Sequence, residues 1–384
     1  MRQERLRFVF FGLSITSSWG NGHATTYRGL VRELASRGHD VLFLERDVPW
    51  YAENRDLPEP PYGRTLLYSS LTELKDRFTS EIANADIVII GSYVPEGLKV
   101  GEWITSLAQG ITAFYDIDTP VTLSHLESGD VEYLSKELIP RFDLYLSFTG
   151  GPTLRLLERH YRAKRARVLY CSADPDIYRP ADKEVRWDLG YLGTYSPDRQ
   201  PTIDELLLRP ARECKARRFA VAGPLYPESL QWPANVHYSS HVAPADHRNF
   251  YNSQRFTLNV TRQAMIKAGY SPSVRLFEAA ACGVPIITDL WRGLASVFKP
   301  GREILVARSG AEVVKMLTTI PEERRIQIGR NARQRVLKEH TAAQRASLLE
   351  HYFVEAIASR PAKLFGVKLP ADQGFAQAVR GQPA

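Results

Sequence analysis

The stretch Tyr270–Asp289 reads Y-S-P-S-V-R-L-F-E-A-A-A-C-G-V-P-I-I-T-D and divides into a loop, a helix, a stop and a buried strand. Ser271 is a common residue type at a helix N-cap, and Pro272 fits the first helical position, where a missing N–H is tolerated. Gly283 fits the position just past a helix end, and the branched run after Pro285 is typical of a parallel strand. The stretch therefore predicts a helix followed directly by a strand of an α/β domain.

Steps of four and three residues bring Ser271, Arg275 and Glu278 onto one face of this predicted helix. That face carries a hydroxyl, a guanidinium and a carboxylate close to the free N–H groups of the helix start, which favour an anion. An alkyl phosphate would bind the helix start and Arg275, and a ribose diol would bind Glu278. The alternative is an ordinary surface helix with an Arg275–Glu278 ion pair, and the spacing alone leaves both interpretations open.

The segment resembles the donor-nucleotide motif of two-domain GT-B glycosyltransferases, in particular the CgeB-like branch related to the family 4 retaining enzymes. In these relatives a glutamate, seven further residues and a second glutamate close on the nucleotide sugar. Glu278 matches the second glutamate, within L-F-E-A-A-A-C-G-V-P-I-I-T-D, whereas Tyr270 stands at the position of the first. The resemblance therefore implies ribose binding by Glu278 but no sugar-side carboxylate at position 270.

Length and composition indicate a globular protein of two domains. The chain has 384 residues, 44% of them hydrophobic and 24% charged. Its three cysteines are widely spaced and form no C-x-x-C pair, which favours a reducing compartment. The N-terminal apolar run is only as long as a strand, and no run reaches 18 apolar residues, so we expect neither a signal peptide nor a membrane span. A cytoplasmic protein is expected.

The net charge of +7 is unevenly distributed, because Arg155–Arg167 holds six Lys or Arg residues in thirteen positions. One interpretation is a solvated helix face and loop. The other is peripheral contact with an anionic surface, such as acidic lipid, a phosphorylated glycan or nucleic acid. The segment lacks the interleaved aromatic residues of a single-strand nucleic-acid binder. Whether it binds a membrane or a nucleic acid stays open.

Strands alternate with helices twice along the chain, which predicts two parallel sheets covered on both faces. The resemblance covers most of the chain, most strongly from Gly190 to Asp289, and implies the GT-B fold. That fold consists of two Rossmann-like, doubly wound α/β domains that face each other across a cleft. The expected division is an acceptor-side domain over 1–180, a nucleotide-sugar domain over 181–340, a helix crossing back over 341–360 and a loosely ordered tail over 361–384.

Gly20-Asn21-Gly22-His23 is a partial match to the dinucleotide fingerprint, and Glu45 stands where a ribose-binding acid of a nicotinamide enzyme would. The match is poor, because Thr25 takes the third glycine position and the loop after the first strand is too long. In GT-B relatives a glycine-containing loop here lies beneath the donor diphosphate. His23 is therefore a candidate general base, as in some inverting relatives. Alternatively, it only hydrogen-bonds a neighbouring loop.

Asp116 and Asp118 follow a predicted strand at the edge of the first sheet. In family 4 relatives a donor-contacting histidine occupies this place. The two carboxylates could bind a sugar hydroxyl or deprotonate an acceptor, or they could cap the next helix, since Asp118-Thr119-Pro120 is good N-cap chemistry. They also spell D-x-D, a metal motif of another glycosyltransferase fold. In a doubly wound context we expect no metal site, because helix ends and arginine can neutralise a diphosphate.

The predicted second domain offers further donor contacts at the ends of its strands. Thr194 and Arg199 resemble the diphosphate contact of the family, although its usual Arg and Lys pair is incomplete. His241, Val242 and Pro244 match the loop that receives the base. Arg262 and Lys267, just before the opening motif, add positive potential.

These observations predict a metal-independent glycosyltransferase that uses a nucleoside-diphosphate sugar of the UDP or dTDP type and needs no cofactor. Kinship favours retention of the anomeric configuration, while the missing first glutamate and His23 keep inversion open. The alternatives are a nucleotide-sugar 2-epimerase on the same fold and a non-catalytic sugar-nucleotide-binding or coat-assembly protein. The acceptor, whether glycan, lipid, small molecule or protein, stays undefined. The expected catalytic residues are His23, Asp116 and Asp118, and the expected donor-binding residues are Gly22, Thr194, Arg199, His241, Val242, Pro244, Tyr270, Ser271, Ser273, Arg275 and Glu278.

Overall fold

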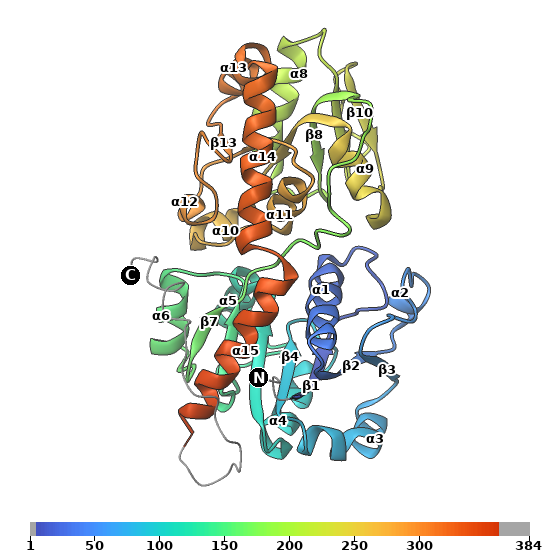
Figure 1. Ribbon diagram of the computed structural model, residues 1–384, viewed down its shortest axis with the longest axis vertical. Helices are drawn as coiled ribbons and strands as arrows, with labels where there is room; N and C mark the ends of the chain where they lie inside the picture. Colours follow the sequence, from blue (N-terminus) through green and yellow to red (C-terminus); the bar gives the residue numbers. More distant parts are fainter. Residues whose placement is uncertain (1–4, 361–384) are drawn as a thin grey trace.

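The computed structural model describes residues 5–360, so the predicted tail over 361–384 lies outside the described residues. The described chain forms two α/β parts stacked end to end (Figure 1). Each part is built on one sheet, and the strand pairs in both sheets are parallel. The α/β prediction with two parallel sheets is therefore confirmed.

The first sheet has the strand order β3-β2-β1-β4-β5-β6-β7. Its central strands are continuous apolar runs because helices cover both of its faces. Its strands are β1 Arg7–Gly12, β2 Asp40–Arg46, β3 Arg64–Tyr68, β4 Ile87–Gly91, β5 Ile111–Asp116, β6 Leu144–Ser147 and β7 Ala166–Val168, and its helices are α1 Gly22–Ser36, α2 Pro49–Ala52, α3 Leu71–Ala83, α4 Gly97–Leu107, α5 Thr119–Ser128, the 3₁₀ turn Ile139–Arg141 and α6 Pro152–Arg159.

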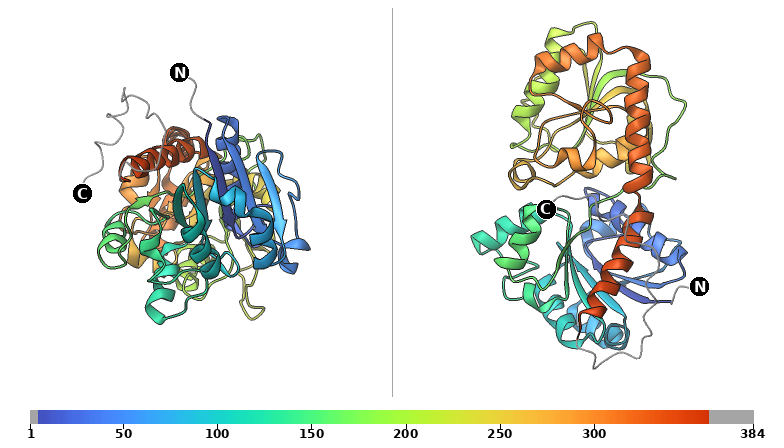
Figure 2. Two further views of the ribbon diagram at one scale, coloured as in Figure 1. Left: turned by 90° about the horizontal axis from the view of Figure 1, so that it is seen from below. Right: turned by 60° about the vertical axis from the view of Figure 1, so that its left-hand side comes forward.

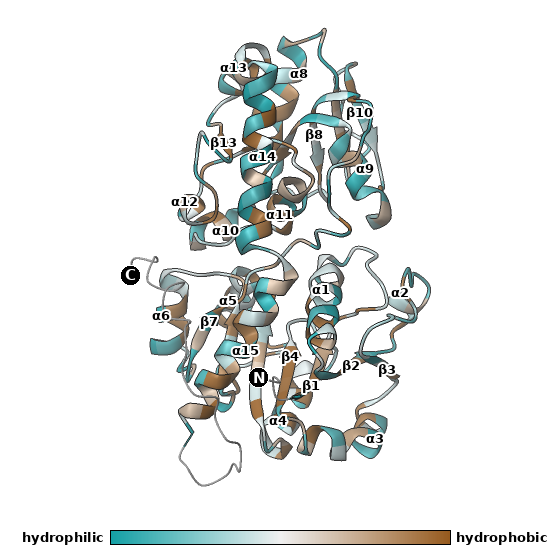
Figure 3. Ribbon diagram, viewed as in Figure 1, coloured by the Kyte–Doolittle hydropathy of each residue, from teal (hydrophilic) through white to brown (hydrophobic). Residues whose placement is uncertain are grey.

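The second sheet has six strands in the order β10-β9-β8-β11-β12-β13. Figure 3 shows the brown, hydrophobic colour gathered in interior strands such as β4, while the turns of α14 carry much teal. The strands are β8 Trp187–Leu192, β9 Phe219–Ala222, β10 Val236–Ser239, β11 Gln254–Asn259, β12 Ile286–Thr288 and β13 Leu305–Val306, and the helices are α7 Gln200–Ile203, the π-helical turn Asp204–Leu208, α8 Arg209–Glu213, the 3₁₀ turn Pro244–Asp246, α9 His247–Asn252, α10 Gln263–Ala268, α11 Val274–Ala281, α12 Leu294–Val297, α13 Gly310–Thr319 and α14 Glu322–Glu339.

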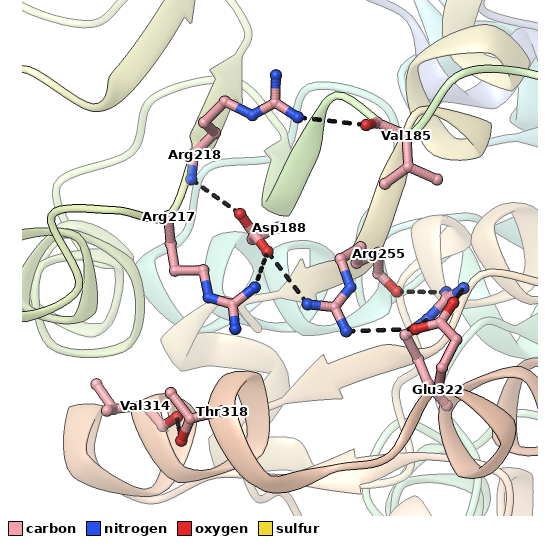
Figure 4. Close-up of polar contacts among 9 residues, drawn as sticks. Val185, Asp188, Arg217, Arg218, Arg255, Val314, Thr318 and Glu322 are labelled. Atoms are coloured by element: carbon pink, nitrogen blue, oxygen red, sulfur yellow. Dashed lines mark hydrogen bonds and ion pairs between the residues drawn. The ribbon is translucent and has the colours of Figure 1, made fainter.

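A charged network occupies the amino end of the second sheet (Figure 4). Asp188, near the start of β8, accepts hydrogen bonds from Arg217 at 2.9 Å and Arg255 at 3.3 Å. Arg255 also reaches Glu322 at the start of α14, at 3.3 Å. This network joins strand ends to α14. The opposite, carboxyl ends of the strands face the first part of the chain. Open α/β sheets bind ligands at the carboxyl ends of their strands.

Helix α15 Ala342–Ala358 returns to the first part of the chain (Figure 2). Its Leu349 and Phe353 belong to the same buried cluster as Phe8 of β1. At the end of α1, Arg37 donates to the carboxylate of Glu350 at 2.9 Å. We propose the limits 1–180, 181–340 and 341–360 for the two domains and the crossing helix.

The two places where the chain crosses between the parts are bonded to each other. Ala173 donates its N–H to His340 O at 3.1 Å, and Ala342 donates to Ala173 O at 3.3 Å. The buried Arg345 donates to the carbonyl oxygens of Tyr170 at 2.9 Å and Cys171 at 3.2 Å. One side chain of α15 therefore holds the other crossing segment in place.

Within residues 5–360, every helix is too short or too polar to cross a bilayer.

Candidate functional site

A cavity of about 440 Å³ lies between the two parts, at the carboxyl ends of both sheets. The loop after β1 and the loop after β5 form one wall, and the loops after β8, β9 and β10 together with the start of α11 form the other. The cavity brings together most of the sequence-predicted site residues, namely Gly22, His23, Asp118, Thr194, Arg199, His241, Val242, Pro244, Ser273, Arg275 and Glu278.

Helix α11 begins two residues later than predicted, so the assignment of Ser271 as its N-cap was wrong. The helix starts at Val274 with Ser273 at the N-cap, and the Ser273 hydroxyl donates to Asn259 Oδ1 at 2.7 Å. Ser271 instead accepts a hydrogen bond from Thr149 Oγ1 of the first part at 3.0 Å. This contact holds Ser271 at the seam between the parts, away from the helix start.

Arg275 and Glu278 turn to separate partners. Arg275 donates to the Leu192 carbonyl oxygen and, at 3.1 Å, to Asn259 Oδ1, and its guanidinium lies 4.9 Å from the Tyr191 ring centroid. Glu278 is 6% exposed and accepts from the Tyr251 hydroxyl at 3.2 Å. Among the described residues no Arg275–Glu278 ion pair forms, so the surface-helix alternative was wrong.

Three arginines line the cavity. Arg199 is buried, donates to the Thr194 carbonyl oxygen and keeps a buried Nε without a partner within the described part of the chain. Burial lowers the pKa of Arg199, and the nearby Arg275 and Arg262 lower it further. In residues 5–360 neither Arg199 nor Arg275 forms an ion pair, so both guanidiniums can face an anion.

Two glycines permit close packing in the loops that follow β8 and β9. A Cβ at Gly193 would lie 2.6 Å from Arg275 Nη2. Gly223 has φ +149°, and a Cβ there would lie 2.1 Å from Gly193 O. Backbone and guanidinium groups are therefore concentrated within one short wall of the cavity.

His23 presents its ring to the cavity from the start of α1. Its backbone N–H donates to Asn21 Oδ1 at 3.0 Å, whereas its buried Nδ1 has no hydrogen-bond partner among residues 5–360. Burial, assisted by the charge of Arg262, lowers the pKa of His23 to about 4. The imidazole is therefore neutral at neutral pH and can accept a proton.

Asp116 and Asp118 point in different directions. Asp118 lines the cavity, accepts from the Tyr93 hydroxyl at 3.3 Å and lies 3.7 Å from Arg262 Nη1 across the cleft. It occupies the N-cap position of α5, but its side chain makes no capping bond. Asp116 is fully buried outside the cavity lining, where Thr122 Oγ1 donates to it at 2.7 Å and Tyr145 OH at 2.5 Å. The geometry therefore corrects the catalytic assignment of Asp116, because its carboxylate is enclosed by these donors.

Burial raises the pKa of Asp116 from 3.8 to about 6. A group whose pKa is raised on folding stabilises the native state fully below its unfolded pKa and loses that contribution as pH rises through the folded value. Asp116→Asn should therefore gain stability relative to the wild type between pH 4 and pH 6, by up to about 3 kcal/mol. Urea unfolding of both proteins at several pH values measures this, and a difference that is constant across the window would contradict the assignment.

Tyr270 also lies outside the cavity lining, so the geometry does not support the predicted donor contact. It has φ +48°, and its ring fills the space beside Gly151 and Gly293, where an added Cβ at either glycine would lie 2.5 Å from a ring carbon. Its carbonyl oxygen accepts from Gly150 N at 2.9 Å. Tyr270 therefore fastens the second part to the first.

Several lining residues were missed by the sequence analysis. His247 Nε2 donates a hydrogen bond to the Val242 carbonyl oxygen at 3.2 Å and supports the loop after β10. Tyr251 meets Glu278 from α9, and Met265 lies on α10. Short helices in strand-end loops carry little periodicity, so no pattern marked these positions. Lys267 lies on α10 but does not line the cavity.

Glu45 does not serve a ribose in this fold. Its carboxylate is fully buried and accepts from Ser14 Oγ at 2.9 Å, Ile15 N at 2.7 Å and Thr16 N at 3.0 Å. The loop after β1 therefore satisfies the Glu45 carboxylate with its own hydrogen-bond donors. Glu45, the residue that had favoured a nicotinamide enzyme, is explained by this structural role.

Residues 199–351 match a family model described as glycosyl transferase-like. Solved structures match almost the whole chain. HepE from Anabaena in complex with UDP-glucose is 14% identical with a TM-score of 0.68, over 93% of this chain and 100% of that one. The chain has the GT-B glycosyltransferase fold, and its residues 199–351 are similar to the glycosyl transferase-like family.

Two further GT-B structures match with similar coverage. Sucrose-phosphate synthase from Thermosynechococcus elongatus is 13% identical with a TM-score of 0.62, over 93% of this chain and 100% of that one. A glycosyltransferase from Rickettsia africae ESF-5 is 11% identical with a TM-score of 0.65, over the same shares. No curated protein sequence matches the chain. The predicted GT-B fold is confirmed, whereas the CgeB-like branch stays a prediction.

Proposed function

We propose that this GT-B glycosyltransferase moves a sugar from a nucleoside-diphosphate sugar of the UDP or dTDP type to an acceptor. The observation that best supports this proposal is the group of arginines that lines the cavity near the start of α11. Among the described residues, Arg199 and Arg275 form no ion pair, and Arg262 pairs with Asp118. A departing diphosphate gains negative charge, and fixed cations facing it stabilise the transition state. HepE, a protein of the same fold, is described in complex with UDP-glucose, which supports this class of donor.

The donor would lie across the wall formed by the second part. Its diphosphate would contact Arg199, Arg275 and the N-terminus of α11, and its ribose hydroxyls would bind Glu278. The acceptor would approach from His23 and Asp118, opposite. We propose a reaction without a metal ion, since these cations supply the charge that the diphosphate needs, and retention of the anomeric configuration on kinship.

The deciding experiment incubates the protein with UDP- and dTDP-sugars, with and without acceptor extracts, in the presence of EDTA. Nucleoside diphosphate released only with acceptor supports the transferase. A changed sugar without acceptor indicates a 2-epimerase, and binding without turnover indicates a non-catalytic protein. Either of the last two results would overturn the proposed function, and a need for added divalent ions would overturn its metal independence.

Glu278→Gln should weaken nucleotide binding by about 1–3 kcal/mol, because an amide is a poorer acceptor for ribose hydroxyls than a carboxylate. Calorimetry with UDP and dTDP measures the loss. The exposed Glu228, outside the cavity lining, provides the matched control Glu228→Gln. Unchanged affinity of Glu278→Gln for the nucleotide that binds the wild type would remove Glu278 from the ribose site.

A further inference from the structure

Trp19 is an exposed large side chain in a mostly buried loop. In the connection between β1 and α1, Ser14 to Ser18 and Asn21 are buried, but Trp19 is 39% exposed. Its neighbours Ser18, Gly20 and Asn21 line the cavity. The loop therefore presents an indole at the edge of the candidate donor site.

The backbone around Trp19 is held by buried and charged partners. Asp56 accepts from both Ser18 N and Ser18 Oγ at 2.7 Å, and its two oxygens accept from the Arg28 guanidinium at 2.9 Å. On the other side, Asn21 Nδ2 donates to Ser17 O at 3.1 Å. A loop fixed on both sides of one residue holds that side chain in a defined place, as a preorganised contact requires.

The indole meets the second part of the chain across the cleft. Its ring centroid lies 4.4 Å from that of His241, with the ring planes at 40°. His241 lines the cavity together with Val242 and Pro244. These residues follow β10, which lies at the edge of the sheet and is separated by β9 and β8 from β11, the strand that precedes α11 in the chain. The Trp19–His241 pair therefore closes the cleft with two aromatic rings, one from each part.

We propose that Trp19 and His241 form an aromatic clasp that takes the nucleobase of the donor between their rings. The inference rests on the proposed function, since it requires a nucleoside-diphosphate donor. A flat base needs about 3.5 Å to each neighbouring ring, so a base between two rings requires a spacing of about 7 Å. At 4.4 Å the clasp is shut. The two parts must separate there to admit a base, and they close again on it.

The clasp gives affinity without choosing the base, because every base has two faces that stack. Because Trp19 belongs to the acceptor-side part and His241 to the other part, a base held between them contacts both parts, and closure of the acceptor-side part depends on whether a donor is bound. The choice among bases is then left to backbone groups of the loops after β9 and β10.

Calorimetry with UDP, dTDP, GDP and ADP on the full chain tests the clasp. Inorganic pyrophosphate is the probe that lacks a base, and its affinity is measured by displacement of the tightest-binding nucleotide. Trp19→Ala should weaken the binding of that nucleotide on the order of 10-fold, while Trp19→Phe keeps most of the affinity. Pyrophosphate should bind all variants alike. Trp50, which is 59% exposed on α2 and outside the cavity lining, provides the control Trp50→Ala, with no expected change.

Three results would overturn the inference. Equal losses for nucleotide and pyrophosphate in Trp19→Ala would mean that the indole only supports the loop. Unchanged nucleotide affinity would remove the clasp and leave the proposed function standing. If none of the four nucleotides binds the wild type, both the clasp and the proposed donor class fail.

Discussion

His23→Ala should lower turnover about 10²–10⁴-fold with nucleotide affinity kept, if the product shows inversion of the anomeric configuration. The neutral ring at the cavity wall, with a buried Nδ1 that has no partner in residues 5–360, fits a general base. The exposed His160, whose ring lies beside Tyr161, provides the control His160→Ala. Proton NMR of the product against the donor gives the configuration.

If the product retains the configuration, the loss in His23→Ala should be milder, and Asp118→Asn should reduce turnover more through sugar positioning. Asp116→Asn should then act on stability, because its carboxylate is enclosed away from the cavity. Full activity in both His23→Ala and Asp118→Asn would mean that the acceptor side of the cleft is assigned wrongly.

The pH profile adds a separate test of His23. Because burial and Arg262 lower its pKa to about 4, kcat/KM should lose activity on the acid side only near that pH. Arg262→Gln removes a positive charge that opposes protonation, so this acid limb should move upward. An acid limb that stays in place would show that another group sets it.

Arg275→Ala should reduce kcat on the order of 10²–10³-fold while the affinity for the donor changes much less. The reason is that the guanidinium faces a diphosphate whose charge grows as the glycosidic bond breaks. Arg333 contacts the opposite end of the same helix by donating to Ala281 O at 3.2 Å, so Arg333→Ala is a matched control.

Steady-state kinetics separates the two parameters, and thermal unfolding checks that both variants fold. Normal turnover in Arg275→Ala would mean that Arg275 only holds Asn259 and the end of β8 in place by hydrogen bonds. A rise in KM with unchanged kcat would assign it to ground-state binding alone.

The sequence predicted what depends on local patterns. Branched runs such as Ile286–Thr288 appear as strands, and Gly283 ends its helix with φ +74° as expected. Glu278 and Arg275 face the cavity because one helix carries both. These predictions hold because side-chain period and glycine conformation act within a few residues.

What could not be predicted depends on contacts between distant segments. Asp116 turns from the cavity because Tyr145, 29 positions away, donates to it. Tyr270 and Ser271 lie at the seam because the loop at Thr149–Gly151 meets them there. None of these partners is visible in the local pattern.

The bonded crossing segments and the seam at Tyr270 and Ser271 hold the two parts of the chain together on one side of the cavity. Ala173, His340 and Ala342 pin the crossings to each other, and Arg345 holds Tyr170 and Cys171 from α15. Parts held by these bonds and by the seam at Tyr270 and Ser271 are restricted from sliding past each other, so we expect opening to be a swing about these contacts. A swing changes how far apart facing residues lie but keeps them paired. His23 would therefore meet the same wall of the second part at the end of each closing.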